Sequence, residues 1–334
     1  MLKKLALVAL VTAVSVSSSF AADKINGAGA SFPAPLYYDW AYSYKKDTKN
    51  RVNYQSIGSG GGIKQITKRV VNFGASDKPL NSKKLAKAKL FQFPAAIGSI
   101  VIAFNVKGIA DETLKLSNDV VADIFAGVIT KWNDPKIAAT NSGVKLPNEK
   151  IIVVRRSDGS GTTYNFTYYL SGSSENWKNS YGVGKAVDWA VGIGGKGNEG
   201  VANLVKQTPY SIGYMEHAYK EKNHLSAAIL KTANGKWVTA TEENFKAAAK
   251  YASWTKEDNF YAMLALQPGD NSYPIVAATF ILLPYEKPAM NKKVIAFFDY
   301  AFKNGDKSAK KLGYISLPEA TKKMVREYWA ANIK

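Results

Sequence analysis

The sequence of 334 residues contains no cysteine and only two histidines. Without cysteine the chain can form no disulfide, no thiolate metal site and no cysteine nucleophile, and it has no cysteine that could carry a lipid at its N-terminus. His217 and His224 lie among tyrosine, lysine and glutamate, which is typical of surface residues rather than of a metal pair. We therefore expect no metal site and no cofactor.

Long apolar runs are also scarce. Residues 5–16 form one, after the basic start Met1-Leu2-Lys3-Lys4 and before the small residues around Ala21. This order predicts a signal peptide over residues 1–22, cleaved after Ala21 or Ala22, because the run is too short for a convincing membrane anchor. Export without a lipid anchor predicts a soluble protein in the periplasm.

Acidic residues are few relative to basic ones. The chain has 26 Asp and Glu against 45 Lys and Arg, a formal charge of +19 that includes Lys3 and Lys4. Nucleic acid is a common partner of such a charge, but the lysines are scattered through amphipathic segments and the export signal disfavours a genomic partner. We expect small anions or an acidic surface to be the partner, and no nucleic acid.

The stretch at residues 155–163 is the strongest local pattern. The β-branched run at 151–154 predicts a buried strand, and residues 164–170 predict the body of a helix. Between them lie Arg155, Arg156 and a glycine-broken turn that carries hydroxyls to the helix N-terminus, where unpaired N–H groups favour an anion. The alternative is a helix cap beside two solvated arginines.

The same order of strand, glycine turn and helix occurs twice more. Residues 25–35 predict a strand and turn leading into a helix with an apolar face at Leu36, Trp40 and Tyr44. Residues 52–57 predict a strand, 58–62 a glycine-serine turn and 63–67 a helix. Taken alone, the glycine run could be a flexible loop.

A strand predicted at 70–77 delivers Asp77 at its end, although Asp77 could merely begin a turn. Since open α/β sheets bind ligands at the carboxyl ends of their strands, we expect these segments to meet around one small anion.

Longer strands predict how the units are joined. Residues 91–94 and 100–105 resemble one long strand leaving the first unit, and residues 273–283 another that returns to it. We therefore predict an α/β protein with two lobes joined by two crossing strands and a ligand cleft between them. Lobe 1 is predicted over residues 23–102 and 275–334, and lobe 2 over residues 103–274.

Several motifs occur in the order of a known family. They are GAGASFPAP at 27–35, GSGGG at 58–62, FGASD at 73–77, RRSDGSGT at 155–162, GIGGKGN at 192–198 and FFDYA at 297–301. With them the chain resembles, over nearly its whole mature length, the phosphate-binding proteins of bacterial high-affinity ABC phosphate transporters. The resemblance implies the type II periplasmic binding protein fold, with a dehydrated phosphate held between the lobes.

The resemblance also implies particular binding residues. These are Ser31, Phe32 (through its N–H), Ser59 and Asp77 in lobe 1, and Arg156, Ser160, Gly161 and Thr162 in lobe 2, with Asp158 orienting Arg156. Asp77 would accept a hydrogen bond from a protonated phosphate oxygen. The strand pleat agrees in placing Arg156 and Asp158 on one side and Arg155 on the other, but it does not choose between the arginines.

The predicted function is a non-enzymatic, monomeric receptor that passes phosphate to membrane permease subunits. One alternative is a receptor for another tetrahedral oxoanion, such as sulfate or molybdate, which carries no proton for Asp77 at neutral pH. A second is a secreted phosphatase built around Ser59 or Ser160, although neither serine fits a nucleophile elbow. A third is an adhesin-like surface role, which only the basic charge of the chain supports.

Overall fold

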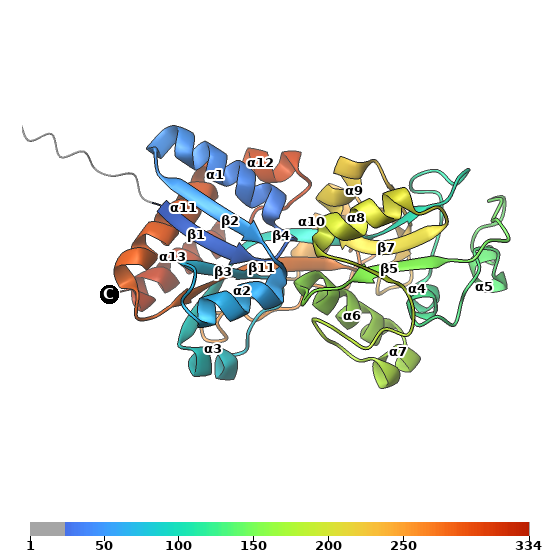
Figure 1. Ribbon diagram of the computed structural model, residues 1–334, viewed down its shortest axis with the longest axis horizontal. Helices are drawn as coiled ribbons and strands as arrows, with labels where there is room; N and C mark the ends of the chain where they lie inside the picture. Colours follow the sequence, from blue (N-terminus) through green and yellow to red (C-terminus); the bar gives the residue numbers. More distant parts are fainter. Residues whose placement is uncertain (1–23, 334) are drawn as a thin grey trace, which may run out of the picture.

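The computed structural model describes residues 24–333, so the predicted signal peptide at residues 1–22 lies outside the described residues. Two lobes lie on the left and the right in Figure 1, and one nine-stranded sheet runs through both. A separate two-stranded sheet pairs β9 (Leu230–Lys231) with β10 (Trp237–Val238).

Strand β4 (Leu90–Asn105) connects the lobes. Its first part pairs antiparallel with β11 (Val276–Pro284), as far as the pair Ser99 and Val276. From Ile100 onwards it pairs antiparallel with β7 (Ser211–Glu216). The long strand predicted from the two apolar runs is confirmed, and it changes partner between Ser99 and Ile100.

Lobe 1 has the strand order β2-β1-β3-β11-β4. β1 is parallel to both β2 and β3, whereas β11 runs antiparallel to β3. The remaining strands of this lobe are β1 (Lys24–Gly29), β2 (Arg51–Ser56) and β3 (Phe73–Ser76). Its helices are α1 (Ala34–Thr48), α2 (Gly58–Thr67), α3 (Ser82–Ala88), α11 (Pro288–Asn304), α12 (Asp306–Lys311) and α13 (Glu319–Asn332).

Lobe 2 continues the sheet in the order β4-β7-β5-β6, with β8 (Ser226–Ala227) also on β4. β5 (Ile152–Arg156) is parallel to β7 and to β6 (Ile193–Gly195). The helices of this lobe are α4 (Asn118–Phe125), α5 (Pro135–Ala138), α6 (Gly161–Ser173), α7 (Glu175–Ser180), α8 (Gly197–Gln207), α9 (His217–Asn223) and α10 (Glu242–Ala249).

Aromatic side chains fill the core of each lobe. In lobe 1 the ring of Phe298 packs edge-on against Phe73, with the ring centroids 5.4 Å apart. In lobe 2 the rings of Phe166 and Tyr214 stack with centroids 4.2 Å apart. Such packing fixes the strand ends, and therefore the loops that follow them, in one position.

The glycine run at residues 58–62 is helical, so the predicted turn is wrong. Helix α2 begins at Gly58 rather than at residue 63. A Cβ atom on Gly62 would lie 2.5 Å from Gly29 Cα and 2.7 Å from the carbonyl oxygen of Ala75. Glycine is therefore needed for α2 to lie directly against β1 and β3, and the alternative of a flexible loop is also wrong.

One histidine departs from its predicted place. The side chain of His217 is only 14% exposed, and its ring packs edge-on against Phe245 with centroids 5.3 Å apart. His224 is exposed, as predicted. Within residues 24–333 no group of histidine and acidic side chains has the arrangement of a metal site, and no helix is both long and apolar enough to span a bilayer.

Candidate functional site

The N-termini of α2, α6 and α8 meet where the two lobes touch (Figure 1). Each of these helices follows the carboxyl end of a strand, as predicted for α2 and α6. The Gly60 N–H in α2 donates to the carbonyl oxygen of Gly159, just before α6, at 2.7 Å. The first N–H groups of these helices lack partners within the helix, so their junction favours an anion.

Ser59, Asp77 and Gly161 form one hydrogen-bonded group across the junction. The Gly161 N–H donates to Ser59 Oγ at 3.0 Å, and the Ser59 hydroxyl donates to Asp77 Oδ2 at 3.3 Å. A Cβ atom on Gly161 would lie 2.4 Å from Ser59 Oγ and 2.7 Å from Asp77 Oδ2. Only glycine therefore allows α6 of lobe 2 to approach lobe 1 this closely.

The Asp77 carboxyl group is buried, with the residue 1% exposed. Its Oδ1 atom has no hydrogen-bond partner among the described residues. Burial raises the pKa of Asp77 to about 7, although the nearby hydroxyl group of Thr279 and the charge of Arg156 oppose the shift. Asn165 of α6 donates from Nδ2 to the Asp77 carbonyl oxygen at 2.7 Å, which holds the backbone in place. The buried carboxyl group therefore has one oxygen atom, Oδ2, bonded to Ser59 at the junction and a second, Oδ1, free to accept a hydrogen bond.

Arg156 is the buried cation of the site. Its side chain is 1% exposed and donates to Asp158 through Nε, at 2.8 Å from Oδ1, and through Nη2, at 2.6 Å from Oδ2. Nη1 lies 3.3 Å from Thr162 Oγ1. Burial raises the pKa of Asp158, but hydrogen bonds from Arg156 and Gly197 outweigh burial, and its pKa lies below the usual value. This fork fixes the plane of the guanidinium group.

The two adjacent arginines of β5 differ in burial. Arg156 is buried, whereas Arg155 is partly exposed and donates from Nη1 to the carbonyl oxygen of Arg156 at 3.4 Å. The two side chains therefore point to opposite sides of the strand, as the pleat predicted, and Arg156 shares its side with Asp158.

Ser31 and Thr162 are connected by Asn198, which the sequence reasoning did not single out. Asn198 donates to Ser31 Oγ from its backbone N at 3.0 Å and from Nδ2 at 2.8 Å. Nδ2 also lies 3.1 Å from Thr162 Oγ1. The available signal was the position of Asn198 at the end of the glycine-rich stretch 192–198, which opens α8 as a further strand, glycine and helix unit.

Phe32 and Ser160 complete the predicted set. Phe32 is buried, and its carbonyl oxygen accepts a hydrogen bond of 2.6 Å from the Tyr314 hydroxyl. Ser160 is buried as the N-cap of α6, where its Oγ accepts from the Thr163 N–H at 2.9 Å. The structure thus brings both parts of the predicted site to one junction, with Ser31, Phe32, Ser59 and Asp77 from lobe 1 and Arg156, Asp158, Ser160, Gly161 and Thr162 from lobe 2.

The chemistry of the junction is that of an anion site with one acceptor. Backbone N–H groups, hydroxyls and a guanidinium group can donate, and the free oxygen atom of Asp77 can accept. A small oxoanion that carries at least one proton matches this set, because it can receive the donors and still donate to Asp77. The side chain of Ser59 is hydrogen-bonded to Asp77 and Gly161, and that of Ser160 to Thr163. None of these contacts supplies the histidine base that a serine nucleophile commonly uses.

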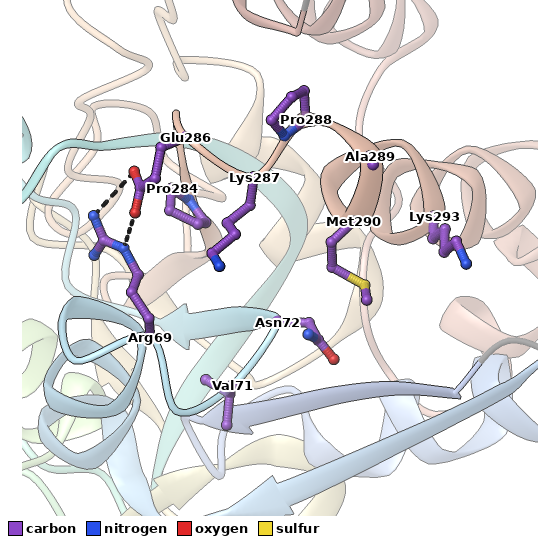
Figure 2. Close-up of a pocket in the computed structure, with 10 residues that line it drawn as sticks. All are labelled: Arg69, Val71, Asn72, Pro284, Glu286, Lys287, Pro288, Ala289, Met290 and Lys293. Atoms are coloured by element: carbon purple, nitrogen blue, oxygen red, sulfur yellow. Dashed lines mark hydrogen bonds and ion pairs between the residues drawn. The ribbon is translucent and has the colours of Figure 1, made fainter.

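A separate hollow lies on the outer side of lobe 1. It has a volume of about 490 Å³ and is lined by the turn after α2, the end of β11 and the start of α11. Figure 2 shows the ion pair of Arg69 with Glu286 on one side of the hollow. Lys287 and Met290 lie at the start of α11.

The chain is similar to known proteins in both sequence and fold. Residues 14–304 match a family model described as "PBP superfamily domain". The chain is 49% identical over 315 residues to the phosphate-binding protein PstS of Haemophilus influenzae, covering 94% of each chain. It is 50% identical over 315 residues to PstS of Pasteurella multocida, covering 94% of this chain and 92% of the relative.

A solved structure of a phosphate-binding protein from Stenotrophomonas maltophilia aligns with a TM-score of 0.65 at 21% identity, covering 92% of this chain and 94% of that one. At this identity the likeness shows the fold alone, and it confirms the predicted two-lobed α/β fold of type II periplasmic binding proteins. The curated relatives are far closer in sequence and match over nearly the whole length. The chain therefore belongs to the PstS family of phosphate-binding proteins, within the PBP superfamily.

Proposed function

We propose that this protein binds inorganic phosphate at the junction of its lobes and delivers it to the membrane permease of an ABC transporter. One observation carries the proposal: Arg156, which donates, and the free oxygen atom of Asp77, which accepts, are buried at the same junction. Phosphate retains a proton at neutral pH, so it can accept from Arg156 and donate to Asp77 at once.

The hydroxyl groups of the site are prepared to donate. Ser31 Oγ already accepts two hydrogen bonds from Asn198, and Thr162 Oγ1 accepts from Asn198 and Arg156. A hydroxyl has two acceptor positions and one hydrogen, so filling the acceptor positions leaves the hydrogen for a ligand. In this proposal Ser59 and Gly161 exchange the hydrogen bonds that they make to Asp77 and to each other for bonds to the ligand. Ser160 and the N–H of Phe32 supply further donors, and Asp158 orients Arg156.

The family supports a proposal for the cellular role. Relatives named phosphate-binding protein PstS match over nearly the whole chain. We infer that the protein is exported by its signal peptide, acts as a monomer in the periplasm and closes lobe 1 (residues 23–102 and 275–334) on lobe 2 (residues 103–274). The family consists of solute-binding proteins, and the proposal includes no catalytic step.

Calorimetric titration tests the ligand. At pH 9, where Asp77 is charged, we expect tight binding of phosphate and much weaker binding of sulfate and molybdate, because those anions carry no proton for Asp77. Sulfate or molybdate binding as tightly as phosphate would overturn the ligand assignment. Turnover of a chromogenic phosphate ester by the purified protein would instead support a phosphatase.

A further inference from the structure

Three consecutive backbone carbonyl groups at the site are each bound by a tyrosine hydroxyl. Tyr54 donates to the carbonyl oxygen of Ala30, Tyr219 to that of Ser31 and Tyr314 to that of Phe32, each at 2.6 Å. All three tyrosines are buried. They come from β2, from α9 and from the segment between α12 and α13, so this loop is held from three directions.

Tyr219 is the member of this set that reaches across from lobe 2. Its helix α9 directly follows β7, which pairs with the second part of β4. Tyr54, Tyr314 and the three carbonyl groups all belong to lobe 1. The hydrogen bond from Tyr219 therefore requires the lobes to be closed, whereas the bonds that Tyr54 and Tyr314 make to these carbonyl groups do not.

The carbonyl group that Tyr219 binds belongs to the peptide between Ser31 and Phe32. In a planar trans peptide the C=O and N–H groups point in opposite directions. Tyr219 therefore holds the back of the peptide whose N–H the proposed function directs at phosphate. A hydrogen bond to a carbonyl oxygen also polarises the peptide and strengthens its N–H as a donor.

Glu199 of α8 extends this contact to a second point on lobe 1. Its Oε1 atom lies 3.3 Å from the Tyr219 hydroxyl and accepts from Ser56 Oγ, at the end of β2, at 3.2 Å. Burial, together with the charge of Glu199, raises the pKa of Tyr219 well above its usual value. Tyr219 therefore keeps its proton and stays a donor at physiological pH.

We propose that Tyr219, next to the separate contact of Glu199 with Ser56, is a positioning residue that latches the closed lobes and orients the peptide between Ser31 and Phe32 towards the ligand. The inference rests on the proposed phosphate site. Because the latch forms on closure, it acts on the lifetime of the closed complex and not on the first encounter with the anion.

Stopped-flow kinetics of Tyr219→Phe test this inference. We expect phosphate to dissociate about fivefold faster, which corresponds to about 1 kcal/mol, the typical net contribution of one hydrogen bond. The association rate should stay within twofold of wild type, and so should the melting behaviour of the ligand-free protein. Glu199→Ala, which removes the contact with Ser56 across the lobes, should change the dissociation rate in the same direction by a smaller factor, and it serves as a second variant if Tyr219→Phe folds poorly.

Tyr54→Phe is the matched control. It deletes the same hydroxyl group at the same distance from the neighbouring carbonyl oxygen, but within lobe 1. We expect it to lower thermal stability more than Tyr219→Phe does and to change phosphate dissociation by less than twofold. Equal effects of the two variants on dissociation, or an effect of Tyr219→Phe on association alone, would overturn the latch. Failure of the wild-type protein to bind phosphate would instead reject the proposed function.

Discussion

Two adjacent arginines in β5 offer a direct comparison at the scale of single residues. Arg156 is buried and forks onto Asp158, whereas Arg155 is partly exposed. Arg156→Lys should weaken phosphate binding at least tenfold, because a point charge cannot replace a fork that bonds both Asp158 and a ligand. Arg155→Lys should cost less than about 1 kcal/mol. Isothermal titration of both variants measures the difference, and equal losses would mean that Arg155 also faces the ligand.

Asp77 is the residue from which we expect selectivity. Sulfate would place bare lone pairs against the free oxygen atom of a carboxylate, which leaves a buried acceptor unpaired and two negative charges in contact. In Asp77→Asn the amide can donate, so sulfate should gain far more affinity than phosphate. We predict that the ratio of phosphate to sulfate affinity falls at least about tenfold, or about 1.4 kcal/mol.

Competitive titration at pH 9, where Asp77 is charged, and at one ionic strength measures this ratio, and the pH dependence of sulfate binding checks its cause. Burial raises the pKa of Asp77 to about 7, so the carboxyl group is charged at pH 9 and largely neutral at pH 6. Sulfate does not titrate in this range, and its affinity for the wild type should therefore rise as the pH falls towards 7 and then level off. Asp77→Asn should lack this dependence. An unchanged affinity ratio would instead make Asp77 a turn residue.

At the scale of elements, glycine near the start of a helix allows close packing between the lobes in one case and within lobe 1 in another. Gly161 opens α6 and lies against Ser59 and Asp77 of the other lobe, whereas Gly62 of α2 lies against Gly29 and Ala75 of its own lobe. Gly161→Ala should therefore obstruct closure and weaken phosphate binding at least tenfold, with little change in the stability of the ligand-free protein. Gly62→Ala should lower that stability, because its clash is within lobe 1.

Thermal melting of the two ligand-free variants, together with phosphate titration, separates these effects. A Gly161→Ala protein that binds phosphate normally would show that α6 can shift at no cost and that close approach of the lobes is not required.

Much of the site could be predicted because it rests on local patterns. A strand followed by a glycine turn and a helix can be recognised within a short stretch of sequence. Three such stretches predicted that Ser31, Ser59 and Arg156 lie at strand ends. Family motifs then chose Arg156 over Arg155, which the pleat alone could not do. The start of α2 at Gly58 was missed because a run of glycine is a poor helix former in isolation, and only packing against β1 makes it favourable.

The tyrosine contacts could not be predicted in this way. Tyr219 and Tyr314 bind carbonyl groups 188 and 282 positions away in the sequence. Tyrosine is common in this chain, with 19 in all, and nothing near Tyr219 distinguishes it from the others. Contacts of this kind depend on how distant segments pack in the folded chain and, for Tyr219, on how the lobes meet, and a single sequence carries no local pattern for either.

Charge acts at the scale of the whole molecule. The chain has a formal charge of +19, and lysines also gather at the junction. Lys78, next to Asp77, lies with its Nζ 4.3 Å from the ring centre of Tyr164 in the other lobe. Burial and the nearby charges of Lys84 and Lys185 lower the pKa of Lys78 to about 8. An anion that approaches the junction therefore meets a positive field before it reaches Arg156.

We predict that this field speeds the capture of phosphate and contributes little to the bound state. Added salt should slow association while leaving dissociation nearly unchanged, because screening over about 10 Å at 0.1 M acts on the approaching anion and not on buried contacts. Stopped-flow measurements over a series of salt concentrations give both rates. Tyr219→Phe should keep the same salt dependence of association as the wild type, since its effect is on opening.

The two rates thus report on different parts of the molecule. If dissociation carried most of the salt effect, surface charge would be holding the lobes together, and the contacts of Tyr219, Gly161 and Asn165 between the lobes could not be the main source of closure. If both rates were independent of salt, the excess of lysine would have no part in capture, and an acidic surface on the permease would be its remaining partner. Only a salt effect confined to association agrees with a buried site of mostly neutral donors inside a strongly positive protein.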